Sequence, residues 1–148
     1  MVLGCVASKY PIDSVPKLKI DSRLIGDWKI KDSDTNERFS LSRASDNEYL
    51  IMYKDSKFET QQPFYGYLSE VNKALFLNGY RGEDTTMGYL LLKIININAD
   101  ATEITATNVI DTTLKYARSS QVIRKRVEKN LNNRSFYGSP SAVFYKVN

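Results

Sequence analysis

Apolar and polar positions alternate along most of the chain, which is the pattern of β-strands that bury one face. The alternation is clearest in residues 37–43, where Phe39 and Leu41 share one face and polar residues the other. Turn-forming Ser, Asp, Asn and Gly residues separate the apolar runs. The pattern predicts eight strands, at residues 24–31, 37–43, 48–54, 58–68, 74–80, 88–98, 103–110 and 142–147.

One segment has a helical period instead. Ile123, Val127 and Leu131 recur every fourth residue, and Ser119 or Ser120 can cap a helix ahead of them. We therefore expect a helix at about residues 120–132 that packs its apolar stripe on the strands. The predicted fold class is mainly β: an antiparallel meander of about eight strands, with one C-terminal α-helix before the last strand.

Length and composition narrow the class of protein. A chain of 148 residues suits one domain with one core. The sequence has no His, which removes the usual general base at neutral pH, and its single Cys excludes an intramolecular disulfide. Carboxylates are scattered through turns, and no Ser stands in a nucleophile motif. We expect no catalytic residues, no metal site and no cofactor, and so a protein that is not an enzyme.

The single cysteine lies in the segment Met1-Val2-Leu3-Gly4-Cys5. Val-Leu-Gly-Cys resembles a bacterial lipobox, which implies a lipid on Cys5. A signal peptide needs about 7–15 apolar residues, and only three residues separate Met1 from Cys5, so the expected chain start lies upstream. The alternative is a free thiol in a loose tail. Residues 1–21 are predicted as a lipobox-like start and flexible tether, and residues 22–148 as a single lipocalin-like β domain.

A wider resemblance covers nearly the whole chain. Its order of segments is similar to that of small uncharacterised lipoproteins of Bacteroidota. The resemblance implies a lipid-anchored protein of the bacterial cell envelope, and it implies no activity. Residues 6–9 lack the acidic residues that resemble a surface-export signal in Bacteroidota, so we expect the domain to face the periplasm. The segments that carry it are residues 10–14 (Tyr-Pro-Ile-Asp-Ser), 19–21 (Lys-Ile-Asp), 24–29 (Leu-Ile-Gly-Asp-Trp-Lys), 88–94, 111–114 and 129–133.

The Gly-x-Trp motif of Gly26 and Trp28 opens the first predicted strand. Followed by a meander, a late helix and a closing strand, it resembles the start of a lipocalin-type barrel. In lipocalins the Trp plugs the closed end of the barrel and a basic residue packs across it. The resemblance implies barrel closure by Gly26 and Trp28, and the sequence leaves Lys146 and Arg124 open as the basic partner.

Two sets of residues are candidates for binding. Tyrosines on the predicted strands offer apolar area and a hydroxyl for a small apolar ligand, although strand-spaced aromatic residues also serve as simple core. These candidate cavity residues are Tyr49, Tyr53, Tyr65, Tyr67 and Tyr89.

The second set is basic. Residues 115–134 hold seven Lys or Arg residues and one acid, a local net charge of +6 within a chain of +4. Candidate contacts to anionic groups on the helix are Arg124, Lys125, Arg126 and Lys129. The expected function is an envelope lipoprotein with a small β-barrel binding or structural module, whose partners are the membrane and a small apolar ligand or a protein. The alternative is a cytosolic domain that binds nucleic acid or an acidic partner through the basic helix; nucleic acid is the less favoured partner.

Overall fold

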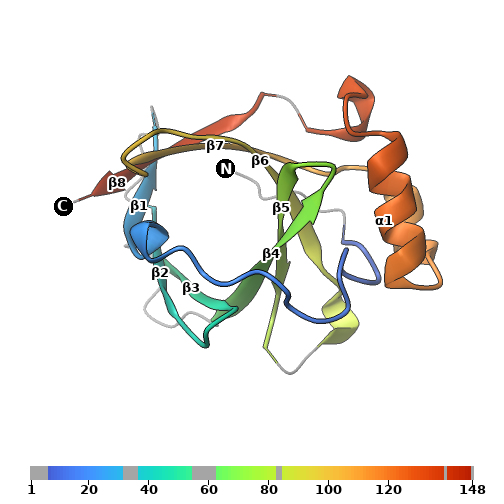
Figure 1. Ribbon diagram of the computed structural model, residues 1–148, viewed down its shortest axis with the longest axis horizontal. Coiled ribbons are helices and arrows are strands. Elements are labelled where there is room, and N and C mark those ends of the chain that lie inside the picture. The colour runs from blue at the N-terminus through green and yellow to red at the C-terminus, as the bar shows by residue number, and fades with distance from the viewer. Residues whose placement is uncertain (1–6, 32–36, 55–62, 83–84, 139, 148) are drawn as a thin grey trace.

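The computed structural model describes residues 7–31, 37–54, 63–82, 85–138 and 140–147. Cys5, the predicted turn at residues 32–36 and the first part of the predicted strand 58–68 lie outside these ranges. Within them the chain forms a closed antiparallel barrel in which each strand pairs with the next and β8 returns to β1 (Figure 1). The strands are β1 Gly26–Ile30, β2 Arg38–Arg43, β3 Tyr49–Lys54, β4 Phe64–Val71, β5 Ala74–Tyr80, β6 Leu90–Ile97, β7 Glu103–Asn108 and β8 Ala142–Val147.

The predicted fold class is confirmed: eight strands close a barrel, and one α-helix precedes the last strand. Because the barrel closes, no strand is left with an unpaired edge. Residues 88–98, the most apolar run of the chain, therefore contain one strand of a closed barrel, β6, and not the central strand of an open sheet. The connection between the predicted strands 58–68 and 74–80 is shorter than expected, because β4 continues to Val71 and the turn needs only Asn72 and Lys73, both at positive φ.

The helix α1, Ser120–Lys129, begins as the sequence predicts. The Ser119 hydroxyl accepts a hydrogen bond from the Val122 backbone N–H at 3.2 Å, which satisfies one of the free donors at the helix start. The helix ends three residues before the expected position 132. Four short 3-10 helices complete the described part of the chain: η1 Ser22–Leu24, η2 Thr85–Met87, η3 Thr112–Tyr116 and η4 Arg134–Phe136.

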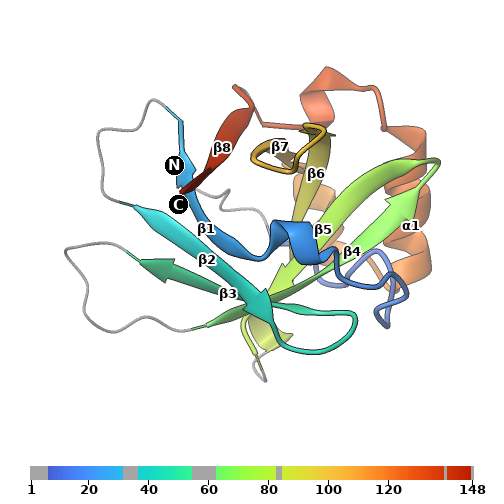
Figure 2. The same ribbon diagram turned by 60° about the vertical axis from the view of Figure 1, so that its left-hand side comes forward.

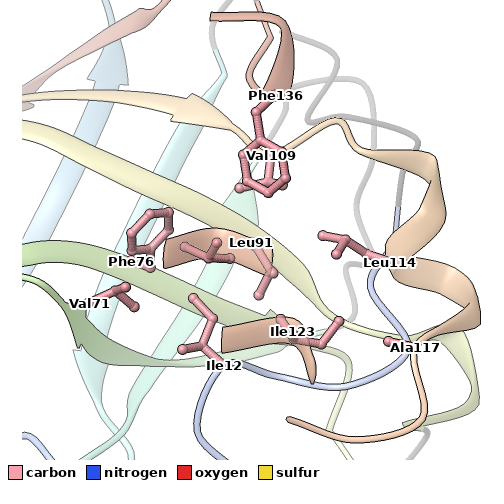
Figure 3. Packing of buried hydrophobic residues seen from close by; sticks show 10 residues of the cluster. Ile12, Val71, Phe76, Leu91, Val109, Leu114, Ala117, Ile123 and Phe136 are labelled. Atoms are coloured by element: carbon pink, nitrogen blue, oxygen red, sulfur yellow. The ribbon is translucent and has the colours of Figure 1, made fainter. Parts of the chain in front are cut away.

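Apolar side chains gather in two clusters, one on each side of the barrel wall. The inner core lies inside the barrel and consists of Leu24, Trp28, Phe39, Tyr49 and Ala101 with partly buried neighbours. The outer core lies between the wall and α1 (Figure 3), and consists of Ile12, Val71, Phe76, Leu91, Val109, Leu114, Ala117, Ile123, Val127 and Phe136. Strand β4 contributes to both clusters, with Val71 in the outer core and Leu68 packed on the inner core, because successive side chains of a strand point to opposite faces.

The N-terminal segment starts on the outer face of the barrel, where Ile12 packs, and then passes to η1 at one end of the barrel, where Ile20 joins the inner core (Figures 1 and 2). The sequence analysis expected a flexible tether here, and the structure differs. Ile12 belongs to the outer core, and Ser8 forms an isolated bridge with Tyr89. Pro11 and Ile12 are buried in this segment, whereas Val15 is 59% exposed. The packed domain thus starts close to residue 8.

Candidate functional site: the barrel interior and its two ends

One end of the barrel is closed around Trp28, whose side chain is 2% exposed. The indole Nε1–H donates a hydrogen bond to the Leu24 carbonyl at 3.0 Å, which fixes η1 across the barrel end. Lys146 lies next to Trp28 in the β1–β8 pair, and its ammonium sits 5.7 Å from the centroid of the indole ring. Of the two basic residues that the sequence left open, Lys146 therefore lies over the Trp.

Gly26 makes room for this lysine. A Cβ atom at position 26 would stand 2.8 Å from Lys146 Cε, and the backbone φ of +145° is one that L side chains rarely adopt. The lysine stem passes over Gly26, and Nζ donates a hydrogen bond to the Arg23 carbonyl at 2.6 Å. Position 26 therefore needs glycine for two reasons, its backbone φ and the space that Lys146 occupies. Trp28, two residues later, lies on the same face of β1, which accounts for the Gly-x-Trp spacing.

Further hydrogen bonds hold the cover in place. The Asp21 backbone N–H donates to the Tyr49 hydroxyl at 2.7 Å, and burial raises the pKa of that hydroxyl. Ala101, in the turn between β6 and β7, is fully buried against the same cluster. The end of the barrel at η1 is therefore sealed by side chains and backbone together.

The rest of the barrel interior is lined by apolar side chains. Most of them are partly exposed although they point into the barrel, as are Ile20 and Ile25 beside η1. Phe39 is buried among aromatic rings and lies 5.3 Å from Tyr53 and 5.8 Å from Phe144, measured between ring centroids. The partly exposed inner-core residues along β1, β3, β7 and β8 include Ile30, Ile51, Tyr53, Ile104 and Phe144. We call this partly exposed apolar lining the cup.

The five candidate cavity tyrosines divide between the two faces of the wall. Tyr49 and Tyr53 belong to the inner core, as a cavity requires. Tyr65 and Tyr67 point outward, since a Cβ at Gly66 between them would meet the inward-facing Ile51 side chain at 3.1 Å. Tyr89 packs on the outer core. The structure therefore does not bring the five tyrosines together around one cavity.

The outward tyrosines form a cluster of their own with Tyr80. The rings of Tyr65 and Tyr80 stack at 5.8 Å, and Tyr89 lies 5.6 Å from Tyr80. The Tyr80 hydroxyl donates to a Glu48 carboxylate oxygen at 2.5 Å. Burial, together with that carboxylate, raises the pKa of Tyr80, and burial likewise raises the pKa of Tyr67. These hydroxyls stay protonated at neutral pH and act as hydrogen-bond donors.

A buried polar network attaches the N-terminal segment to the wall. Asn78, fully buried on β5, accepts a hydrogen bond from the Ile12 N–H at 2.8 Å and donates to Ser69 Oγ at 2.8 Å. The Asp13 carboxylate, 6% exposed, pairs with Arg124 of α1 at 2.7 Å. Burial alone would raise the pKa of Asp13, but hydrogen bonds from Ser69 and Arg124 and the nearby charges outweigh it and lower the pKa.

The four basic candidates on α1 therefore have different surroundings. Arg124 pairs with Asp13, and Arg126 pairs with Asp111 at 2.6 Å. Lys125 and Lys129 are exposed on the side of the helix away from its buried stripe. Two of the four cations are thus engaged within the domain, and two face solvent.

The part of the chain that the structure describes contains neither a cluster of metal-binding side chains nor a membrane-spanning helix. No group of three or more acidic or cysteine side chains lies close enough to hold a metal ion. No helix in the described ranges is long and apolar enough to cross a membrane.

Sequence reasoning missed the network around Asn78 and Asp13. One signal was present: residues 74–80 are apolar at both alternating sets of positions apart from Asn78, as expected for a strand that is covered on both faces. A lone amide in such a strand needs buried partners, because an unpaired polar group in the interior is costly. One of those partners, the Ile12 N–H, comes from the segment that was interpreted as a tether, and the others, Ser69 and the Tyr67 carbonyl, come from β4.

Comparisons with known proteins give the chain no relatives: no family model matches it, and neither a curated protein nor a solved structure matches.

Proposed function

We propose that this protein is a lipoprotein of the bacterial cell envelope whose small barrel binds an apolar molecule in its cup. The observation that carries the binding function is the partly exposed apolar lining inside the barrel. Trp28 is buried at one end, while Ile30, Tyr53 and Phe144 are partly exposed although they point inward. Exposed apolar surface that points inward is unfavourable in water, and a small apolar ligand would cover it.

The anchor is supported by the position of Cys5. Small and apolar residues precede it as in a lipobox, and Ser8, three residues later, already pairs with the barrel. A lipid on Cys5 would therefore hold the barrel directly at a membrane surface. The residues after Cys5, Val-Ala-Ser-Lys, lack the acidic residues that resemble a surface-export signal in Bacteroidota. We therefore propose that the domain faces the periplasm.

Metabolic labelling tests the anchor. The chain with its genomic upstream sequence is expressed in a Bacteroidota host that is fed a palmitate analogue. The wild-type chain should take up the label and fractionate with membranes, and Cys5→Ser should do neither. Val2→Ser is a milder change that should slow processing. An unlabelled wild-type chain, or a labelled Cys5→Ser chain, would contradict the anchor.

An apolar fluorescent probe tests the binding function. A fatty acid whose emission rises in apolar surroundings should bind the full chain at a one-to-one ratio. A chain that leaves the emission unchanged would contradict a binding role for the cup.

A further inference from the structure

The N-terminal segment joins the domain at a defined place. Ser8 exchanges two backbone hydrogen bonds with Tyr89, both at 2.7 Å, and the Lys9 N–H donates to the Leu114 carbonyl of η3 at 3.2 Å. Three residues of extended chain reach at most about 11 Å, so Cys5 lies within about that distance of Ser8. Any group attached to Cys5 is held near η3.

Large apolar side chains are exposed in this region. Tyr116, at the end of η3, is 74% exposed, and Val122, on the first turn of α1, is 47% exposed. Together with Arg118 they line a hollow of about 310 Å³ between η3 and α1. Met87 is also exposed, and the next residue, Gly88, contacts the backbone of Ser8. Exposed apolar groups gathered in one region mark interaction surfaces more often than groups scattered singly.

Cations surround these apolar groups. Lys9, Lys115, Arg118 and Lys125 are exposed, and the Lys115 ammonium lies 5.0 Å from the centroid of the Tyr116 ring. Asp111, the acid nearest to Arg126, already forms an ion pair with it. Aromatic rings beside Lys and Arg are typical of the zone where proteins meet lipid head groups, and anionic lipids attract such cations.

We propose that the η3–α1 surface, defined as Lys9, Lys115, Tyr116, Arg118, Val122 and Lys125, rests on the anionic head groups of the membrane that holds Cys5. This inference rests on the proposed lipid anchor and adds an orientation to it. Tyr116 and Val122 enter the head-group layer while the cations contact lipid phosphates. Strand β8, which carries the exposed Tyr145, lies on the other side of the barrel from α1 (Figure 1), so Tyr145 should face away from the membrane.

A vesicle experiment tests the orientation without cellular lipidation. Cys5 is the single cysteine of the sequence, so the full chain couples through it to a maleimide lipid. Vesicles contain phosphatidylglycerol, phosphatidylcholine and lipids brominated near the head group, which quench nearby Trp. The Tyr116→Trp chain should lose at least half of its added emission in these vesicles, after subtraction of the Trp28 signal. Tyr145→Trp is the matched control and should lose less than a tenth.

Charge reversal distinguishes electrostatic contact between this surface and the lipid from proximity that the coupling through Cys5 imposes by itself. Adding Lys115→Glu and Arg118→Glu to Tyr116→Trp should reduce the quenching severalfold, because each cation near an anionic surface strengthens binding about fivefold. Both changes are at exposed positions, and an unchanged thermal midpoint shows that the variant is folded. Vesicles of phosphatidylcholine alone should also give weak quenching.

Three outcomes would overturn the inference: equal quenching at positions 116 and 145, quenching that ignores the charge reversal, or emission at position 116 that changes with protein concentration in the absence of vesicles. The last would indicate a protein partner, such as a second copy. Failure of palmitate labelling in cells would overturn the anchor alone, since the maleimide coupling does not depend on it.

Discussion

The ammonium of Lys146 lies 5.7 Å from the centroid of the Trp28 ring, and the two residues are direct partners in the β1–β8 pair. The first and last strands of the barrel therefore meet at a cation–aromatic contact. The same lysine reaches the backbone of η1, so one side chain joins both chain-terminal strands and the cover of the closed end.

Replacing this lysine tests how much the closure depends on it. Lys146→Met keeps most of the apolar stem and removes the charge and the hydrogen bond to the Arg23 carbonyl. We expect a loss of about 1–2 kcal/mol in the free energy of unfolding, from the cation–aromatic contact and the hydrogen bond together. Urea unfolding measures it. The exposed Lys31→Met should change it by less than about 0.5 kcal/mol, and equal effects of the two variants would contradict the account.

Gly26 is expected to tolerate no side chain. Gly26→Ala places a Cβ at an unfavourable φ and 2.8 Å from Lys146, so we expect a loss of about 1–3 kcal/mol. Gly79→Ala is the matched control on β5, since its Cβ would meet its nearest neighbour at 3.7 Å. Thermal unfolding of both variants compares them. A Gly26→Ala chain as stable as Gly79→Ala would contradict the role assigned to Gly26.

The buried amide of Asn78 should hold the N-terminal segment on the barrel. Asn78→Ala leaves the Ile12 N–H without its acceptor, and we expect this to lower the free energy of unfolding by about 1–3 kcal/mol. Hydrogen exchange should then be faster at Ile12 than in the wild-type chain. Asn96→Ala, at an exposed position of β6, should change neither quantity. Unchanged protection at Ile12 in the Asn78 variant would show that the segment is held by other contacts.

Acid should weaken the same attachment. Because its partners lower the pKa of Asp13 in the folded chain, the ionised carboxylate stabilises the fold at pH values above the unfolded pKa of about 3.9. That contribution is lost as the pH falls through the folded pKa. Asp13→Asn should therefore be less stable than wild type at pH 7 and closer to it at pH 3, as measured by urea unfolding. Asp27→Asn, a change on β1 outside this network, controls for the altered net charge; if it shows the same pH dependence, the assignment to Asp13 fails.

Strand alternation and the helical stripe were enough to predict the antiparallel strands and the helix, while the barrel was implied by the resemblance of Gly26 and Trp28 to the start of a lipocalin. The residues that carried the pattern, such as Phe39, Ile123 and Val127, are buried as expected. In β2 and α1 one face is apolar, so the pattern alone indicates which side is covered.

The division of the tyrosines could not be predicted in the same way. In β4 both Tyr67 and Leu68 are large and mostly apolar, so the alternation does not indicate which of them points inward. The structure resolves the ambiguity because residues 12 and 13 contact the outer face of β4 and β5 at Tyr67 and Asn78, which are buried, while Leu68 packs in the inner core. The sequence did not indicate this packing, because the N-terminal segment contains two prolines and several polar residues, a composition that does not predict a packed segment.

The central claim is that the barrel holds a small apolar molecule in the cup lined by Tyr53. The most direct measurement is titration of the full chain with a fluorescent fatty acid, for the wild type and two neighbouring variants of β3. Tyr53→Arg places a charge in the inner core and should weaken binding at least about tenfold, whereas Met52→Arg, on the outward face, should bind as the wild type does. Absence of binding to the folded wild-type chain, or equal affinities of the two variants, would contradict the claim.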